Sequence, residues 1–353
     1  MTEKSVAHVG SGQVMTVNGP IPAAELGLTM MHEHLVNDCS CWWNPPKQAE
    51  RAHLASEKLH VGIIGELRMD PFANLDNCAL DDHQVAAAEL MPFAAAGGRT
   101  VVDPTCRGIG RDLRKLREIS ATTGLHIIMG SGYYLEASHP AVLKTMSIDA
   151  IADEIVQEAL QGVDGTGTRI GLIGEIGVSG EFTTEEEKSL RAAARAQART
   201  GLPIMVHLPA WFRHGGRVLD IIGEEGGDVR QAVLCHMNPS GEDVSYQTAL
   251  ARRGAFIEYD MIGMDYWYAD QQVQCPSDED NARSIRRLID LGFLDRILLS
   301  QDVFLKMMLT RYGGFGYGYV LKHFVPRLKR HGVSDEQIRV MLVDNPRSVF
   351  CSV

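Results

Sequence analysis

Short apolar runs alternate with amphipathic segments along almost the whole chain, and this alternation limits the fold more than any other feature. The runs are rich in Val, Ile, Leu and Met, and several are apolar without a break, as expected for strands that are buried on both faces. They lie at 27–35, 99–103, 126–131, 170–175, 203–207, 232–236, 255–260 and 296–301. The amphipathic segments lie at 83–96, 110–123, 148–161, 184–200, 215–226, 242–253 and 281–291. The pattern predicts an α/β protein with a parallel sheet.

Eight such strands fit a (β/α)8 TIM barrel. The alternative is a doubly wound open sheet, which usually carries a glycine-rich phosphate-binding turn after its first strand. Here His32-Glu33-His34 stands at that position. No Pro/Gly/Ser-rich linker or short repeat divides the chain, so a single domain over residues 1–353 is expected.

Two connections are longer than ordinary loops. Residues 37–82 separate the first strand from its helix, and residues 261–280 follow the seventh strand. Long loops in compact domains are usually functional or disordered. Both contain tryptophan, which favours an ordered lid at the mouth of the barrel.

Potential metal ligands end five of the apolar runs. The first run ends with His32 and His34, and the fourth run ends with Glu175. The fifth, sixth and eighth runs end with His207, His236 and Asp302, respectively. Residues i and i+2 of a strand point to the same face, so His32 and His34 would aim at one point. The C-terminal ends of barrel strands meet at one mouth. The set therefore predicts a two-metal site there.

Each of these residues also has a plain structural interpretation when taken alone. His32 and His34 could be hydrogen-bonded core histidines, and so could His207 and His236. A carboxylate at the end of a buried strand, such as Glu175, needs compensation by a cation or by an arginine. Six such residues at matching strand ends fit a shared pair of cations better than six separate compensations.

With these residues, the chain resembles the phosphotriesterase family of the amidohydrolase superfamily, and within it the phosphotriesterase-related (resiniferatoxin-binding-like) branch. Further strings that carry the resemblance are Thr16-Val17-Asn18-Gly19-Pro20, Gly174-Glu175-Ile176-Gly177, Ser300-Gln301-Asp302, Gly313-Gly314-Phe315-Gly316-Tyr317 and Asn345-Pro346. The resemblance runs from about residue 12 to the C-terminus.

The resemblance implies a metal centre with defined ligands. His32, His34 and Asp302 would hold one divalent ion, and His207 and His236 the other. Glu175 would bridge the two ions together with a hydroxide, in the place where phosphotriesterases proper have a carboxylated lysine. Zinc is the default ion, with manganese, iron or cobalt as alternatives.

The implied activity is hydrolysis of a lactone, carboxyl ester or amide by the metal-bridging hydroxide, with Asp302 as the catalytic proton carrier. Glutamate in place of the lysine leaves phosphotriester hydrolysis as a side activity at most. A small-molecule binding protein, of the resiniferatoxin-binding kind and with little catalysis, is the alternative. The intact Asp302 argues against it, because a pure binder needs no proton carrier.

Several loop residues are candidates for contact with a small-molecule substrate. Tyr133, Tyr134 and Trp267 follow barrel strands, and aromatic side chains favour an apolar or amphipathic organic compound. Arg107 could meet a substrate carboxylate or sulfonate, or it could bridge structural acids. Each aromatic residue could equally serve loop packing.

Charge and cysteine usage argue against several other classes of protein. The 34 basic and 45 acidic residues give a net charge of −11, so no basic surface for nucleic acid is expected. The seven cysteines are scattered without a CxxC pair, which is unlike a disulfide framework. No apolar stretch approaches the ~20 residues of a membrane span, and the first ten residues lack the pattern of a secretory signal. These features favour the cytoplasm, with a homodimer as an expectation from the resemblance.

Overall fold

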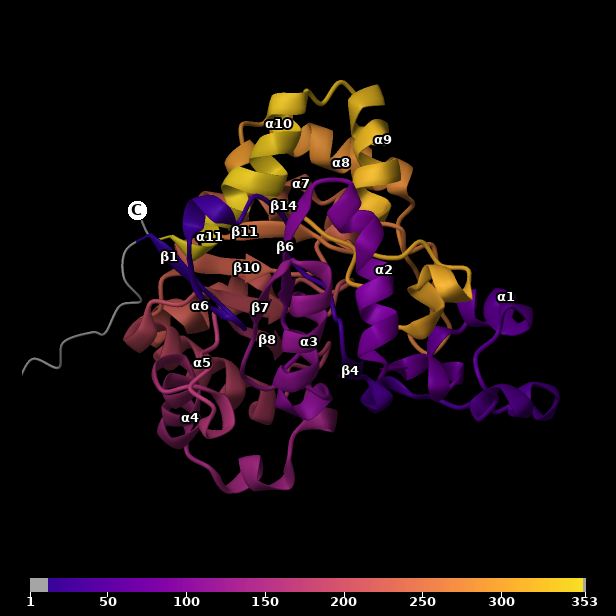
Figure 1. The fold of residues 1–353 in the computed structure, drawn as a ribbon, viewed down its shortest axis with the longest axis horizontal. Helices are drawn as coiled ribbons and strands as arrows, with labels where there is room; N and C mark the ends of the chain where they lie inside the picture. Colours follow the sequence, from indigo (N-terminus) through magenta and orange to yellow (C-terminus); the bar gives the residue numbers. More distant parts are fainter. Residues whose placement is uncertain (1–11, 352–353) are drawn as a thin grey trace, which may run out of the picture.

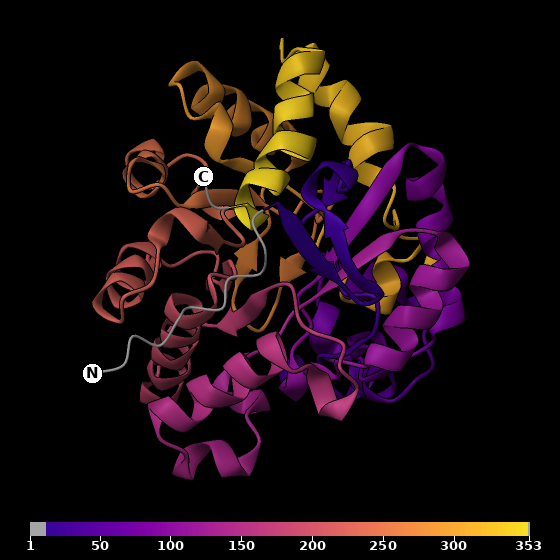
Figure 2. The same cartoon turned by 60° about the vertical axis from the view of Figure 1, so that its left-hand side comes forward.

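The computed structural model describes residues 12–351, so the N-terminal segment used in the signal-peptide argument lies outside the described residues. A three-stranded parallel sheet contains, in order, β3 (Leu28–Met30), β6 (Gly98–Asp103) and β7 (His126–Met129). A five-stranded parallel sheet contains, in order, β14 (Ile297–Leu299), β11 (Phe256–Tyr259), β10 (Ala232–Leu234), β9 (Ile204–His207) and β8 (Ile173–Gly177). A bridge between Ser131 and Gly174 joins β7 to β8, and the amide of Asp302 donates to the carbonyl of His32 between the other two edges. The strands lie at the centre with the helices around them (Figure 2). This is the predicted TIM barrel.

Each predicted strand is present, and all of them except β6 are shorter than their apolar runs. The first run shows the largest difference, since β3 ends before His32. The same-face argument for His32 and His34 therefore does not rest on a regular strand, although both side chains are buried.

The predicted helices are also present. They are α2 (His83–Ala95), α3 (Leu113–Thr123), α4 (Ile148–Leu160), α5 (Thr184–Thr200), α6 (Gly215–Glu224), α7 (Val244–Arg252) and α8 (Asp278–Asp290). Local sequence explains their ends. Thr183 and Glu186 form a capping box at the start of α5, and Gly201 ends it with a left-handed φ of 71°.

Alternation along the strands decides which side chains enter the barrel. Val102, Met205, Val233, Phe256 and Leu298 come from five different strands and pack in one buried cluster, which forms the barrel interior. Their neighbours along the chain pack outward against the helices. Residues at positions two or four further on point inward as well. Because of this two-residue repeat, side chains at the ends of β9, β11 and β14 point toward the barrel mouth.

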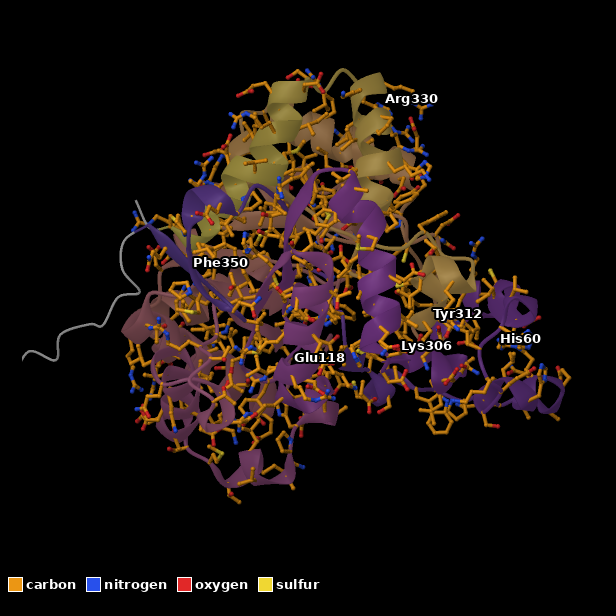
Figure 3. The ribbon with its side chains drawn as sticks, in the orientation of Figure 1. His60, Glu118, Lys306, Tyr312, Arg330 and Phe350 are labelled. Atoms are coloured by element: carbon orange, nitrogen blue, oxygen red, sulfur yellow. The ribbon has the colours of Figure 1, made fainter. Side chains whose placement is uncertain are left out.

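The segment 37–82 is ordered. It contains β4 (Asn37–Asp38), α1 (Ile64–Arg68) and β5 (Ala79–Leu80), and β4 pairs with β5 to close it at its base. Figure 1 places α1 on the side of the molecule opposite β1 (Gln13–Thr16). Lys306, labelled in Figure 3, lies 3.0 Å from a carboxylate oxygen of Asp76 and so ties this segment to the chain after β14.

The sequence interpretation did not anticipate the elements at the two ends. β1 forms an antiparallel hairpin with β2 (Gly19–Pro22), and α9 (Val325–Arg330), α10 (Asp335–Arg339) and α11 (Asn345–Phe350) follow the last strand. The second long connection contains a short hairpin of β12 (Trp267–Tyr268) and β13 (Val273–Gln274). Within residues 12–351, no helix is long and apolar enough to cross a membrane.

Candidate metal centre

The six predicted ligands converge at the mouth of the barrel. Their side chains form two groups, and within each group the ligand atoms lie within 4.8 Å of one another. The first group is His32, His34 and Asp302, and the second is Glu175, His207 and His236. All six residues are buried, with between 0% and 9% of their surface exposed.

Glu175 lies between the two groups. Its Oε1 atom is 3.2 Å from Nδ1 of His207 and 3.1 Å from Nε2 of His236. The same oxygen is 3.6 Å from Nε2 of His32, and Oε2 is 3.9 Å from Nε2 of His34. A carboxylate in this position can contact a cation in each group, which is the geometry of a bridging ligand.

Asp302 completes the first group. Its Oδ1 atom is 3.5 Å from Nε2 of His32 and 3.5 Å from Nε2 of His34. Ligands that surround a cation at ~2.0–2.1 Å in a tetrahedron lie ~3.3 Å from one another, so these separations suit a shared ion.

Two buried atoms of the first group have no hydrogen-bond partner among the described residues. They are Nε2 of His32 and Oδ1 of Asp302. A buried polar atom without a partner is costly, and most such atoms in native proteins are satisfied. A cation between these two atoms would satisfy both, so the donor set fits a bound metal.

Other residues fix the orientation of the imidazoles. The Asp260 carboxylate lies 3.2 Å from Nδ1 of His32 and 3.1 Å from Nδ1 of His236. Thr105 Oγ1 lies 2.7 Å from Nδ1 of His34. Each contact leaves Nε2 of that imidazole directed at the ligand group, as outer-shell partners of metal ligands commonly do.

The sequence interpretation missed Asp260. This residue immediately follows β11 and is the last residue of the predicted run 255–260, so an acid at a strand end was the available signal. It lies four residues beyond Phe256, on the inward side of β11. Glu258, on the same side, is buried and lies 3.7 Å from Nδ1 of His32.

His236 and Asp302 adopt left-handed backbone conformations, with φ of 58° and 47°. Such values are uncommon for residues other than glycine and often occur at functional sites. The surrounding structure holds both. The amide of His236 donates to the Asp260 carboxylate at 2.9 Å, and the amide of Asp302 donates to the His32 carbonyl at 3.1 Å.

Burial and mutual contacts shift the pKa values of the site in opposing directions. Burial raises the pKa of Asp302 to about 7 although His32 and His236 lower it. Burial lowers the pKa of His34 to about 3, and it also lowers the pKa of His207. Burial would raise the pKa of Glu175, but His32 and His207 hold it well below its usual value. Burial would lower the pKa of His32 and of His236, but Glu175 raises the first and Asp260 raises the second well above the ordinary value. Metal ions bind ionised Glu175 and neutral imidazoles, so a bound cation would displace the protons of these two histidines.

A cavity of about 440 Å³ opens onto these residues and has the size of a site for an organic ligand. Five of the six candidate ligands line it, namely His34, Glu175, His207, His236 and Asp302. Most of the other lining residues are apolar or aromatic. They include Trp42, Phe72, Ile109, Trp211, Met261, Met264, Tyr268 and Phe304.

Among the predicted substrate contacts, only Tyr134 lines this cavity. Its hydroxyl lies 3.2 Å from Nδ1 of His207 and accepts a hydrogen bond from Nε1 of Trp42 at 3.1 Å. The neighbouring Tyr133 points the other way and donates to Glu154 at 2.7 Å. Successive residues of an extended segment point in opposite directions, which accounts for the difference.

Arg107 and Trp267 also lie outside the cavity lining. Arg107 pairs with the buried Glu158, which Arg111 contacts as well, so it bridges a structural acid. Trp267 and Tyr268 alternate along β12, and it is Tyr268 that reaches the cavity. The corrections for Arg107 and Trp267 both concern the direction of a side chain that lies outside the barrel strands.

Comparisons with known proteins agree with this geometry. The chain is 37% identical over 341 residues to an N-acetyltaurine hydrolase of Tetraodon nigroviridis, covering 96% of this chain and 97% of the relative. A resiniferatoxin-binding protein from Rhodobacter sphaeroides has a crystal structure that matches with a TM-score of 0.97 and 64% identity, covering 99% of this chain and 98% of the other. The crystal structure of a lactonase from Listeria monocytogenes matches with a TM-score of 0.76 and 26% identity, covering 96% and 98%. Residues 12–350 match the Phosphotriesterase family, and the chain belongs to that family.

Proposed function

We propose that this chain is a metal-dependent hydrolase that cleaves a carboxyl ester, a lactone or an amide of a small organic compound. One observation carries the proposal above the others. Six buried ligand side chains converge on an apolar cavity, and two of their atoms, Nε2 of His32 and Oδ1 of Asp302, lack a partner among the described residues.

The metals are two divalent ions, with zinc as the first choice. His32, His34 and Asp302 would hold one ion, His207 and His236 the other, and Glu175 would bridge them. Bound divalent ions lower the pKa of water and polarise the bond under attack. Imidazole and carboxylate ligands also suit manganese, iron and cobalt.

The chain's own residues then have distinct tasks. Asp302 lines the cavity, and its carboxylate can accept a proton from the attacking water and deliver it to the leaving group. The Tyr134 hydroxyl, held by Trp42, can donate a hydrogen bond to the carbonyl oxygen of the substrate. The apolar wall excludes bulk water, which strengthens both interactions.

The relatives support acyl cleavage of this kind. Several relatives, including the human protein at 33% identity, are named N-acetyltaurine hydrolase, a name that denotes cleavage of an amide. The Listeria structure is named a lactonase. A phosphotriesterase homology protein from Escherichia coli, 29% identical, was solved with phosphate in its active site. We propose phosphotriester hydrolysis as a side activity only, because Glu175 stands where phosphotriesterases proper have a carboxylated lysine.

Binding of a small molecule without turnover is the second candidate. The 64% identical neighbour named for resiniferatoxin binding favours it. The position of Asp302 argues for catalysis instead, because this acid faces the cavity in an uncommon backbone conformation that a binding protein has no need to maintain.

The test is a substrate panel with purified protein loaded with zinc, manganese or cobalt. Lactones, carboxyl esters, N-acyl compounds and phosphotriesters are compared by kcat/KM, with metal content measured on the same samples. Turnover of an acyl substrate that depends on metal and is lost in Asp302→Asn supports the hydrolase. Tight binding of acyl compounds with no turnover by any metal form would favour the binding protein.

Further proposals concern the setting of this activity. A single domain is supported by the continuous barrel, and a cytoplasmic location by the seven free cysteines. A homodimer is also proposed, with no nucleic-acid or membrane partner.

A further inference from the structure

Four aromatic side chains form one continuous wall of the cavity. The rings of Trp42 and Phe72 stack with centroids 5.3 Å apart, and those of Phe72 and Tyr268 stack at 5.3 Å. Trp211 meets Tyr268 edge to face at 5.8 Å. Trp42 and Phe72 come from the segment 37–82, Trp211 follows β9, and Tyr268 comes from β12. Three loops therefore build one apolar surface that adjoins the candidate metal ligands, since the Trp42 and His207 rings lie 6.3 Å apart.

Outside the candidate metal centre, the side chains that line this cavity carry negative charge only. Apart from the candidate metal ligands, Glu181 is the charged residue of the lining, and no lysine or arginine lines it within residues 12–351. Two arginines that are close to lining residues in the sequence are engaged elsewhere. Arg107 pairs with Glu158, and Arg213 lies 3.1 Å from Asp243 and 5.2 Å from the centre of the Tyr246 ring.

From this arrangement we infer that the cavity selects a neutral acyl compound with an apolar or aromatic group and discriminates against anionic substrates such as sulfonates. Transfer of an unpaired anion from water into an apolar site is strongly unfavourable, and Glu181 adds repulsion at the rim. An apolar group instead gains from burial against the aromatic wall. N-Acetyltaurine, for which the curated relatives are named, carries a sulfonate that would find no cationic side chain here.

This inference rests on the proposed hydrolase, and one pair of substrates tests it. Phenethyl acetate and its 4-sulfophenethyl counterpart have the same scissile ester, and the sulfonate is remote from the leaving oxygen. With metal-loaded full-length protein, kcat/KM for the neutral ester should exceed that for the sulfonated ester by at least roughly 100-fold. Equal values, or rapid hydrolysis of N-acetyltaurine, would overturn the inference.

A binding measurement separates this inference from the proposed function. In 5-phenylpentan-2-one a methylene replaces the ester oxygen, so the compound binds without being cleaved, and its 4-sulfophenyl counterpart is the anionic control. Preferential binding of the neutral ketone, by calorimetry, supports the inference even if no ester is hydrolysed, an outcome that would refute the hydrolase alone. Equal binding of the two ketones, or binding of neither, refutes the inference.

A matched pair of variants tests the role of charge. Gln271 is an exposed residue of the cavity lining. Gln271→Arg supplies the missing cation and should improve kcat/KM for the sulfonated ester about five-fold relative to the neutral one, as expected for an exposed ion pair. Gln271→Met has similar length without charge and should leave this ratio as in the parent. An equal change of the ratio in both variants would contradict the electrostatic explanation.

Discussion

The amide of Asp302 donates a hydrogen bond to the carbonyl of His32 at 3.1 Å, and the carboxylate of Asp302 lies 3.5 Å from Nε2 of the same histidine. The first contact closes the barrel between its first and last strands. The second joins two of the three side chains in the first group of candidate ligands. The same two residues therefore take part both in closing the barrel and in forming the candidate site.

Asp302→Asn should reduce kcat by about 10²–10⁴-fold, because the amide keeps the shape of the side chain but cannot accept the proton. Much of the bound metal should remain, since the five other ligands are unchanged. Steady-state kinetics and metal analysis on the same preparation measure both effects. Activity near that of the parent enzyme would exclude Asp302 as the proton carrier.

Asp260→Asn should weaken metal binding by about 10–100-fold, because Asp260 positions His32 and His236 without facing the cavity itself. The readout is metal affinity by competition with a chromogenic chelator. Asp243→Asn, at the start of α7, is the control with the same chemical change. If both variants bind metal like the parent, the supporting role of Asp260 is refuted.

Tyr134→Phe should lower kcat/KM for acyl substrates by about 10–100-fold, because the substrate carbonyl loses a hydrogen-bond donor. Tyr133→Phe is a closely matched control, since its hydroxyl contacts Glu154 away from the cavity. The two variants are compared on one substrate with equal metal loading. A similar loss in both would indicate a general effect on the loop.

Removal of the metal ions should abolish activity and lower the melting temperature, because cations that bind the folded chain stabilise it. Titration of the stripped protein should restore both with two ions per chain. Calorimetry and inductively coupled plasma analysis give the stoichiometry. A single ion at full activity would rule out the binuclear arrangement.

Glu158 provides a pH-dependent contribution to stability outside the metal centre. Burial would raise its pKa, but hydrogen bonds from Arg111 and Ser131 and the charge of Arg107 lower it to about 2. A lowered pKa in the folded state stabilises the protein above the unfolded value of 4.5 and loses this effect as the pH falls toward 2.

The unfolding free energy of the parent relative to Glu158→Gln should therefore shrink by about 1 kcal/mol between pH 6 and pH 3.5. Urea titrations at several pH values measure this difference. A gap that stays constant over the interval would show that Glu158 titrates at its ordinary pKa.

Local features of the sequence were sufficient to predict the strands and helices of the barrel and to select six candidate ligands that the structure brings together. The capping box at Thr183 and the glycine at 201 set the ends of α5, because these interactions involve residues a few positions apart. The proximity of Glu175, His207 and Asp302 could be predicted because strand ends in a parallel barrel share one mouth.

What the sequence determined by itself was the alternation of strands and helices and the identity of the residues at the strand ends. The tertiary structure alone decided that Tyr134 rather than Tyr133, and Tyr268 rather than Trp267, faces the cavity. It also decided that Arg107 pairs with Glu158. The physical reason is that the two-residue repeat of an extended backbone fixes which side chains share a face, whereas the face turned to the cavity depends on partners far away in the sequence, such as Trp42 for Tyr134 and Phe72 for Tyr268.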